Sequence, residues 1–109
     1  MSTLSTHVLD TALGKPAEGV HVVLKHGGAV LGSGTTDGDG RVKDIAGAGI
    51  KLGAGEYSLT FSVADYFRKS SRECFYSDIL VTFNVAAGDQ HYHVPLLVSP
   101  FGYSTYRGS

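Results

Sequence analysis

The sequence predicts an all-β protein of the sandwich type. Apolar and polar residues alternate with a period of two in several short stretches, which is the pattern of half-buried antiparallel strands. Fifteen glycines and the short polar breaks between these stretches argue against long helices. Turn residues return about every 8–12 residues, as they do in β-sandwiches. We therefore expect roughly seven or eight short strands in a single domain that spans residues 1–109.

Five stretches carry the strand pattern, and four of them predict which side chains point into the core. They are residues 5–10, 20–25, 57–63, 79–85 and the segment that begins at His91. In the first stretch, Ser5, His7 and Leu9 share one face, opposite Thr6, Val8 and Asp10. The core faces expected in the other four are Val20, Val22 and Leu24; Tyr57, Leu59, Phe61 and Val63; Ile79, Val81, Phe83 and Val85; and Tyr92, Val94, Leu96 and Val98. Three further aromatic residues, Tyr66, Phe67 and Phe75, are also expected in the core rather than around a cofactor.

Three local features interrupt the alternation. Residues 64–72 do not alternate, and we expect a short helix there with Asp65 as its cap. Residues 37–40 hold two Asp-Gly pairs, which tolerate positive φ, so a tight turn should deliver Arg41 into a short strand. Pro95 cannot donate to a sheet ladder, and its strand is therefore expected at an edge or with a local bulge.

Composition excludes several classes of partner. The formal net charge is −1 and neither sign forms a run, so neither a nucleic acid nor an anionic membrane is expected as a partner. Cys74 is the only cysteine, which excludes an intramolecular disulfide, suits a reducing compartment and predicts a half-buried structural thiol. No apolar stretch approaches the ~20 residues that span a bilayer. A cytoplasmic protein is expected, unless a leader segment has been removed.

Four short motifs carry a resemblance to a known family. They are Leu4 to Asp10 (LSTHVLD), Thr36 to Arg41 (TDGDGR), His91 to Pro100 (HYHVPLLVSP) and Tyr106 to Ser109 (YRGS). In this order they resemble the 5-hydroxyisourate hydrolases, the purine-catabolic branch of the transthyretin-like family, from about Ser5 to the end of the sequence. The resemblance implies a transthyretin-like β-sandwich of two four-stranded sheets with one short helix. It also implies a homotetramer, a dimer of dimers, with the site in a channel between the dimers.

The same resemblance implies a reaction. The expected activity is the hydrolysis of 5-hydroxyisourate to 2-oxo-4-hydroxy-4-carboxy-5-ureidoimidazoline in urate degradation, by metal-free general-base attack of water and without a cofactor. The terminal tetrapeptide is expected to separate these hydrolases from the hormone-carrying transthyretins of vertebrates, whose chains continue with a different sequence.

Site residues follow from the matching motif positions. The resemblance implies His7, Arg41, His93 and Ser109 as catalytic residues, with Tyr106, Arg107 and Gly108 as further substrate contacts. Either His7 or His93 is the base and the other orients water or substrate, while Arg41 stabilises the developing oxyanion. Ser109 would use its hydroxyl and terminal carboxylate, and Arg107 either contacts substrate or anchors the tail.

Other interpretations of the same residues are weaker. A lone strand histidine or turn-exit arginine is usually structural, but here the four motifs favour a site. His91 and His93 lie two apart on one face, which suggests a metal, yet no third ligand accompanies them and no metal site is expected. The main alternative function is a non-catalytic binder of a small aromatic ligand in an intersubunit channel, and an adhesive β-sandwich module is a second. Two histidines and an arginine favour the enzyme.

Overall fold

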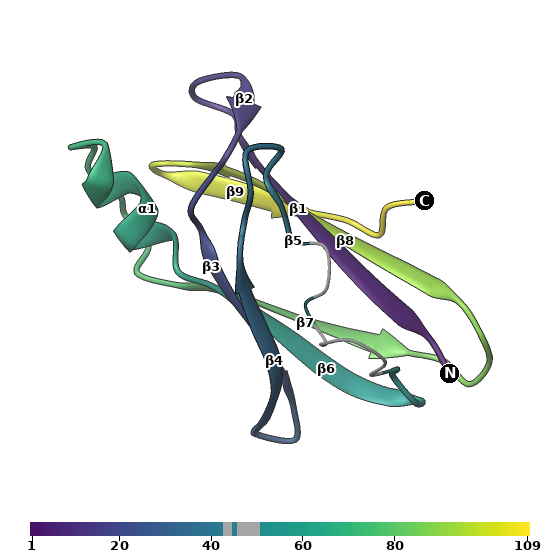
Figure 1. Ribbon diagram of the computed structural model, residues 1–109. Coiled ribbons are helices and arrows are strands. Elements are labelled where there is room, and N and C mark those ends of the chain that lie inside the picture. Colours follow the sequence, from purple (N-terminus) through teal and green to yellow (C-terminus); the bar gives the residue numbers. More distant parts are fainter. Residues whose placement is uncertain (43–44, 46–50) are drawn as a thin grey trace.

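Two stacked β-sheets and one short helix make up the protein (Figure 1). The computed structural model describes residues 1–42, 45 and 51–109. The first sheet has the strand order β2-β1-β8-β9, with β5 paired to β1, and the second has the order β4-β3-β6-β7. The elements are β1 (Thr3–Asp10), β2 (Lys15–Pro16), β3 (His21–His26), β4 (Ala29–Thr35), β5 (Arg41–Val42), β6 (Gly55–Phe61), α1 (Val63–Lys69), β7 (Ile79–Val85), β8 (His91–Ser99) and β9 (Gly102–Thr105).

The sandwich predicted from the sequence is confirmed, with one difference in strand count. Within the described residues the second sheet has four strands, but the first has five. The additional strand arises because the two-residue strands β2 and β5 pair with successive parts of the same edge of β1. Neither strand is long enough to show alternation, so periodicity alone does not reveal them.

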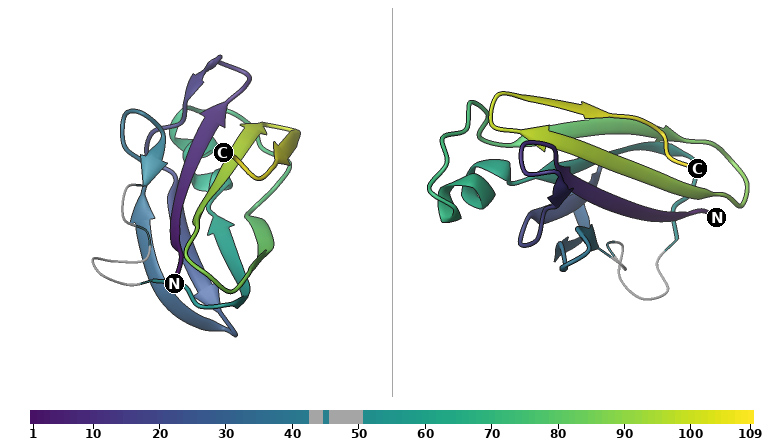
Figure 2. Two further views of the ribbon diagram at one scale, coloured as in Figure 1. Left: turned by 90° about the vertical axis from the view of Figure 1, so that its right-hand side faces the viewer. Right: turned by 90° about the horizontal axis from the view of Figure 1, so that it is seen from above.

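The core lies between the two sheets, as the two layers in Figure 2 show. Alternate residues of each long strand point inward, and β1 shows the pattern clearly because Leu4, Thr6, Val8 and Asp10 are buried while the intervening residues are not. The predicted inward faces are confirmed in β3, β6 and β8, where every predicted core residue within the strands is buried. Val20, just before β3, and Val63 are buried too, but β6 ends at Phe61, so the prediction that its strand reaches Val63 is wrong and Val63 begins α1. In β7 the two middle members of the predicted face, Val81 and Phe83, are half-buried.

A single aromatic residue departs from the predicted core. Phe75 is 74% exposed in the segment after the helix, so the expectation that it packs in the core is wrong. Its ring instead meets Tyr76 edge-on, with centroids 5.1 Å apart. The neighbouring Cys74 is half-buried and without a disulfide, as predicted.

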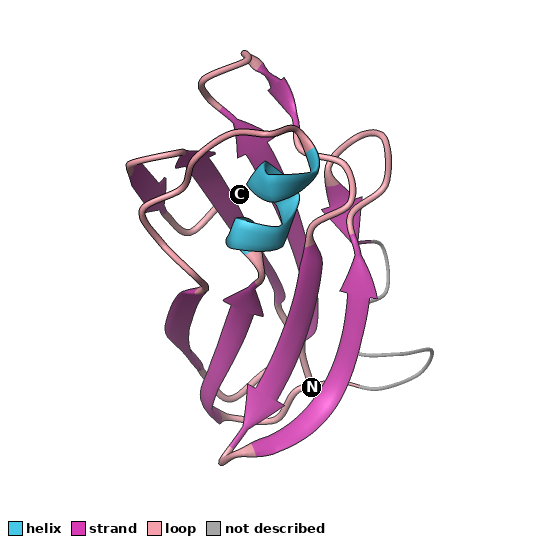
Figure 3. Cartoon of the chain, turned by 90° about the vertical axis from the view of Figure 1, so that its left-hand side faces the viewer, coloured by secondary structure: helices cyan, strands magenta, loops and turns pink. Residues whose placement is uncertain are grey.

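The predicted helix forms, but at Val63–Lys69 and with a different start (Figure 3). The expectation that Asp65 caps it is wrong, because Ser62 is the N-cap residue and makes no side-chain capping bond. Asp65 lies inside the first turn and forms an ion pair with Arg68 at 2.6 Å. Phe67 is fully buried and fixes the helix against the sandwich. No helix in the described ranges is long and apolar enough to cross a membrane.

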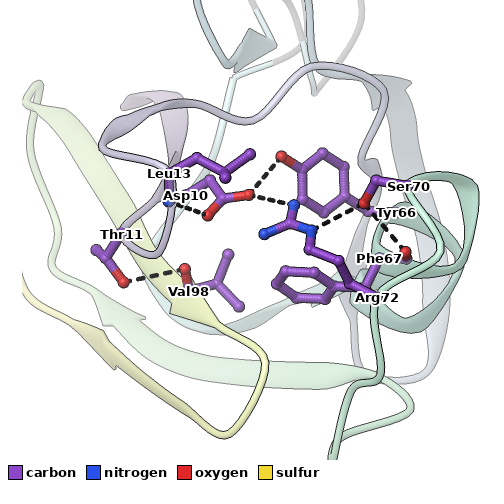
Figure 4. A network of polar contacts seen from close by, with 8 residues as sticks. All are labelled: Asp10, Thr11, Leu13, Tyr66, Phe67, Ser70, Arg72 and Val98. Atoms are coloured by element: carbon purple, nitrogen blue, oxygen red, sulfur yellow. Dashed lines mark hydrogen bonds and ion pairs between the residues drawn. The ribbon is translucent and has the colours of Figure 1, made fainter.

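A buried ion pair joins this helical region to the end of β1 (Figure 4). Asp10 has a fully buried side chain that accepts hydrogen bonds from Arg72 at 2.6 Å, Tyr66 at 2.7 Å and the Leu13 amide at 3.0 Å. Burial alone would raise the pKa of Asp10, but these hydrogen bonds outweigh it and hold the pKa below its usual value. Burial and the nearby carboxylate raise the pKa of Tyr66 to about 12.

The position of Pro95 differs from the prediction of an edge or bulge, which is wrong. Strand β8 lies between β1 and β9, and its parallel ladder with β1 has no register shift. The N–H that Pro95 lacks would point toward β9. On that side the hydrogen-bonded ladder is interrupted between the Leu96–Thr105 pair and the isolated bridge from His93 to Gly108, so no partner needs this N–H. The Pro95 carbonyl accepts a hydrogen bond from Thr105 Oγ1 at 2.7 Å. The chain after β9 therefore leaves the ladder beside Pro95 and rejoins β8 at His93.

Candidate active site

Three adjacent strands of the first sheet bring His7, Arg41 and His93 to its outer face. His7 on β1 is paired directly with Arg41 on β5, and Ser5 on the same face of β1 is paired with His93 on β8. Side chains of directly paired residues project on the same side of a sheet, with Cβ atoms roughly 5 Å apart. The inward neighbours of these residues form the core, so the two histidines and the arginine face outward. The structure thus brings together three of the predicted site residues.

The turn before β5 positions Arg41, as predicted. Asp37 Oδ1 accepts hydrogen bonds from the amides of Asp39 at 2.9 Å and Arg41 at 3.0 Å. Gly40 has a φ of +76°, and a Cβ there would lie 2.4 Å from the carbonyl oxygen of Val8. Among the described residues, no hydrogen bond or ion pair engages the Arg41 guanidinium, which is exposed and available to a ligand.

His7 is oriented by the same turn. Its Nε2–H donates to the carbonyl oxygen of Asp39 at 2.8 Å, because a carbonyl can only accept. When the ring is neutral, the lone pair is therefore on Nδ1. The turn thus holds both His7 and Arg41, one through a side-chain bond and the other through the backbone.

His93 is half-buried and is held through Nδ1, whereas His7 is held through Nε2. Its Nδ1 lies 2.8 Å from Ser5 Oγ, and its ring centroid is 6.5 Å from that of His7 at an interplanar angle of 34°. Burial lowers the pKa of His93, and the positive charge of Arg41 lowers it further, followed by His7 and His91. A neutral imidazole is the form that accepts a proton, so these surroundings suit His93 to act as a base.

The chain after β9 packs against His93. The Gly108 amide donates to the His93 carbonyl oxygen at 2.8 Å, and a Cβ on Gly108 would lie 2.5 Å from His93 Cδ2. Arg107 donates to Gln90 Oε1 at 2.9 Å and lies over the Tyr92 ring, 4.4 Å from its centroid. These contacts are compatible with Arg107 as an anchor of the tail, the second of its two predicted roles, and a contact with substrate stays a prediction.

Tyr106 and Ser109, in the same segment after β9, are exposed. A cavity of about 170 Å³ opens next to the tail, between β7 and β8. Its lining includes Tyr106, Arg107 and His93 but neither His7 nor Arg41. The roles predicted for Tyr106 and Ser109 in the reaction stay predictions.

Ser5 is a further residue at the site that the sequence motifs did not predict. Its hydroxyl contacts both His93 Nδ1 at 2.8 Å and His91 Nε2 at 2.9 Å. The available signal was that Ser5 shares a face with His7, but nothing local shows that β1 pairs with β8. Within the described ranges, no three His, Cys, Asp or Glu side chains are grouped to hold a metal ion.

Comparison with known proteins agrees with the β-sandwich described above. The model of the HIUase/Transthyretin family matches residues 4–108. The chain is 47% identical to the 5-hydroxyisourate hydrolase of Caulobacter vibrioides, with 100% of both chains covered. The structure of Klebsiella pneumoniae 5-hydroxyisourate hydrolase aligns with a TM-score of 0.91 and 40% identity, over 100% of this chain and 94% of that one. Sea bream transthyretin in complex with thyroxine aligns with a TM-score of 0.83 and 25% identity, over 96% of this chain and 93% of that one.

The chain therefore belongs to the HIUase/Transthyretin family. This confirms the resemblance inferred from the four sequence motifs and the transthyretin-like fold that it implied.

Proposed function

We propose that this chain hydrolyses 5-hydroxyisourate to 2-oxo-4-hydroxy-4-carboxy-5-ureidoimidazoline, a step of urate degradation. The observation that carries the proposal is the pairing of His7 with Arg41 and the proximity of both to His93, in a chain 47% identical to a named 5-hydroxyisourate hydrolase. The substrate is an oxygen-rich ring compound, and the planar guanidinium can pair with two of its acceptors at once.

His93 is the general base in this proposal. Its Nε2 takes a proton from water, the resulting hydroxide oxygen bonds to the carbonyl carbon of the cyclic amide, and the ring C–N bond then breaks. His93 returns the proton to the leaving nitrogen, so no proton is gained or lost over the cycle. The half-burial of His93 and its contact with Ser5 at Nδ1 support this assignment.

Arg41 and His7 assist the same step. Arg41 stabilises the negative charge that develops on the carbonyl oxygen, which a fixed cation does effectively because it needs no reorganisation. His7, held by the Asp39 carbonyl, orients the water or the substrate through Nδ1. Tyr106, Gly108 and the Ser109 hydroxyl complete the substrate contacts.

The site is open to solvent in one chain, which supports assembly into a homotetramer. Arg41 is exposed, and the edge strands β7 and β9 present Leu80 at 60% and Tyr103 at 44% exposure, with Phe101 beside β9 at 66%. A second pair of chains over the first sheet would supply the missing wall and exclude water. Sedimentation velocity tests this proposal, and a monomer at assay concentration would contradict it.

The location and other partners are also part of the proposal. The single cysteine, Cys74, supports a cytoplasmic location, and the balanced charge supports the absence of nucleic-acid or membrane partners.

A carrier of a small aromatic ligand is not favoured. The transthyretin aligned above shares 25% identity with this chain, against 47% for the hydrolase. An apolar carrier would also have no need for two histidines and an arginine on the same sheet face.

The experiment generates 5-hydroxyisourate in situ with urate oxidase and follows the decay of its ultraviolet absorbance. The wild-type protein should accelerate the decay, and His93→Asn should lower the catalysed rate by roughly 10²–10⁴-fold. His7→Asn should also be impaired, whereas His21→Asn, on an exposed position of β3, is the matched control. Retained ring opening in both the His7 and His93 variants would overturn the proposal.

A further inference from the structure

A continuous chain of side-chain contacts leads from His93 to solvent along the β1–β8 pair. Ser5 Oγ lies 2.8 Å from His93 Nδ1 and 2.9 Å from His91 Nε2, and His91 Nδ1 lies 2.6 Å from Thr3 Oγ1. The parallel register explains the arrangement, because Thr3 is paired with His91 and Ser5 with His93. The Ser5 hydroxyl therefore lies between two imidazoles that are two residues apart on one strand.

One assignment of protons satisfies all three contacts and leaves Nε2 of His93 free to act as a base. The neutral His93 ring then carries its proton on Nδ1 and donates it to Ser5 Oγ. The Ser5 hydroxyl donates in turn to His91 Nε2, and His91 Nδ1–H donates to Thr3 Oγ1. A hydroxyl can accept and donate at once, which makes serine suitable for the central position.

The two histidines differ in how well they tolerate a positive charge. His93 is half-buried and faces Arg41 from β5 and His7 from β1, so burial and nearby positive charge lower its pKa. His91, by contrast, is the first residue of β8 and is exposed. Arg107 from the tail is engaged with Gln90 rather than with either ring. A proton taken up at His93 is therefore better accommodated when its charge moves outward.

We infer that Ser5 and His91 are positioning residues for His93, which fix its reactive tautomer and carry the charge of the accepted proton toward solvent. This inference rests on the proposed function of His93 as the base. When His93 Nε2 takes a proton from water, the Nδ1 proton passes to Ser5 Oγ and the Ser5 proton passes to His91 Nε2. His91 becomes the imidazolium and His93 is neutral again. The transfers reverse when the leaving nitrogen is protonated, so protons balance over the cycle.

The first test measures the tautomer of His93 in the free protein by ¹⁵N long-range NMR correlations of the imidazole rings. The wild-type ring should carry its proton on Nδ1 and have an unprotonated Nε2. Ser5→Ala should lose this preference, and Ser5→Thr, which keeps a hydroxyl, should retain it. A wild-type ring protonated on Nε2, or an unchanged tautomer in Ser5→Ala, would overturn the inference. This measurement does not depend on hydrolase activity, so it separates failure of the relay from failure of the proposed function.

The second test measures kcat and KM for 5-hydroxyisourate in the same variants. Removing the partner that orients a metal-bound imidazole costs roughly 10- to 100-fold in activity. By analogy, Ser5→Ala and His91→Asn should lower kcat by roughly that factor with KM nearly unchanged. Ser5→Thr should recover most of the loss, and His21→Asn is the control for removal of an exposed strand histidine. An unchanged kcat in His91→Asn with a correctly folded protein would overturn its role.

Discussion

Gly108 sets the distance between the tail and His93, and Gly108→Ala tests whether that distance matters. A Cβ at this position would lie 2.5 Å from His93 Cδ2 and 3.2 Å from Cγ, whereas ordinary Cβ contacts begin at 3.4 Å. The shortfall at Cδ2 is about 0.9 Å, so either the tail or the imidazole must move by nearly that amount. A misplacement of about 1 Å in a catalytic group can cost on the order of 10²-fold in rate. We expect kcat to fall by about that factor.

The fold itself should tolerate this substitution. Gly108 lies outside the strands and is only half-buried, so the overpacking should lower the free energy of unfolding by no more than about 1–3 kcal/mol. The assay follows the decay of enzymatically generated 5-hydroxyisourate, with urea denaturation as the measure of stability. Gly102→Ala is the matched control, because its Cβ would meet only Ser99 Oγ at 3.8 Å. A kcat within twofold of wild type for Gly108→Ala would refute the view that the tail positions His93.

Three further predictions concern the ion pair, the base and the turn. Asp10→Asn should lower the free energy of unfolding by about 3 kcal/mol in urea denaturation, because Arg72 loses a buried partner. The pKa of Asp10 in the folded protein lies below its usual 3.8. The stability difference between wild type and Asp10→Asn should therefore be complete above pH ~4 and disappear as the pH falls through the folded-state pKa of Asp10. A stability difference that does not depend on pH would contradict this prediction. In NMR titration the pKa of His93 should lie below 6.5, so the neutral ring persists to lower pH. Arg41→Met should raise the pKa of His93, and an unchanged pKa in this variant would show that Arg41 does not act on the ring. Gly40→Ala should cost at least about 2 kcal/mol because of its φ of +76° and its blocked Cβ, and unaltered stability would argue against the turn geometry.

The strand faces were predictable because they depend only on local periodicity. Side chains alternate across a strand, so the burial of Tyr57, Leu59 and Phe61 follows from the sequence pattern alone. The turn before Arg41 was predictable for a similar reason, since Asp-Gly pairs favour the backbone conformation that Gly40 adopts. The helix was predictable in existence but not in its start, because Ser62 caps it only through its backbone position.

Several features depended on contacts between distant parts of the chain. Asp10 looked like one more alternating residue, yet its burial is stabilised by Arg72, which is 62 positions away. Pro95 suggested an edge because a proline cannot donate, but β9 accommodates it with a gap in the ladder. Phe75 is exposed although its side chain is apolar. Local composition contains no information on these outcomes.

The sequence by itself determined the sandwich, its inward faces and the residue types of the candidate site, because alternation and motif order are local properties of the chain. Only the tertiary structure decided how those residues meet. The parallel pairing of β1 with β8 joins positions 88 residues apart and places the Ser5 hydroxyl between His91 and His93. The position of the tail against His93 likewise depends on Gly108, where a side chain would collide with the ring. Such contacts depend on which strands become neighbours, and that choice is made by packing of the whole core.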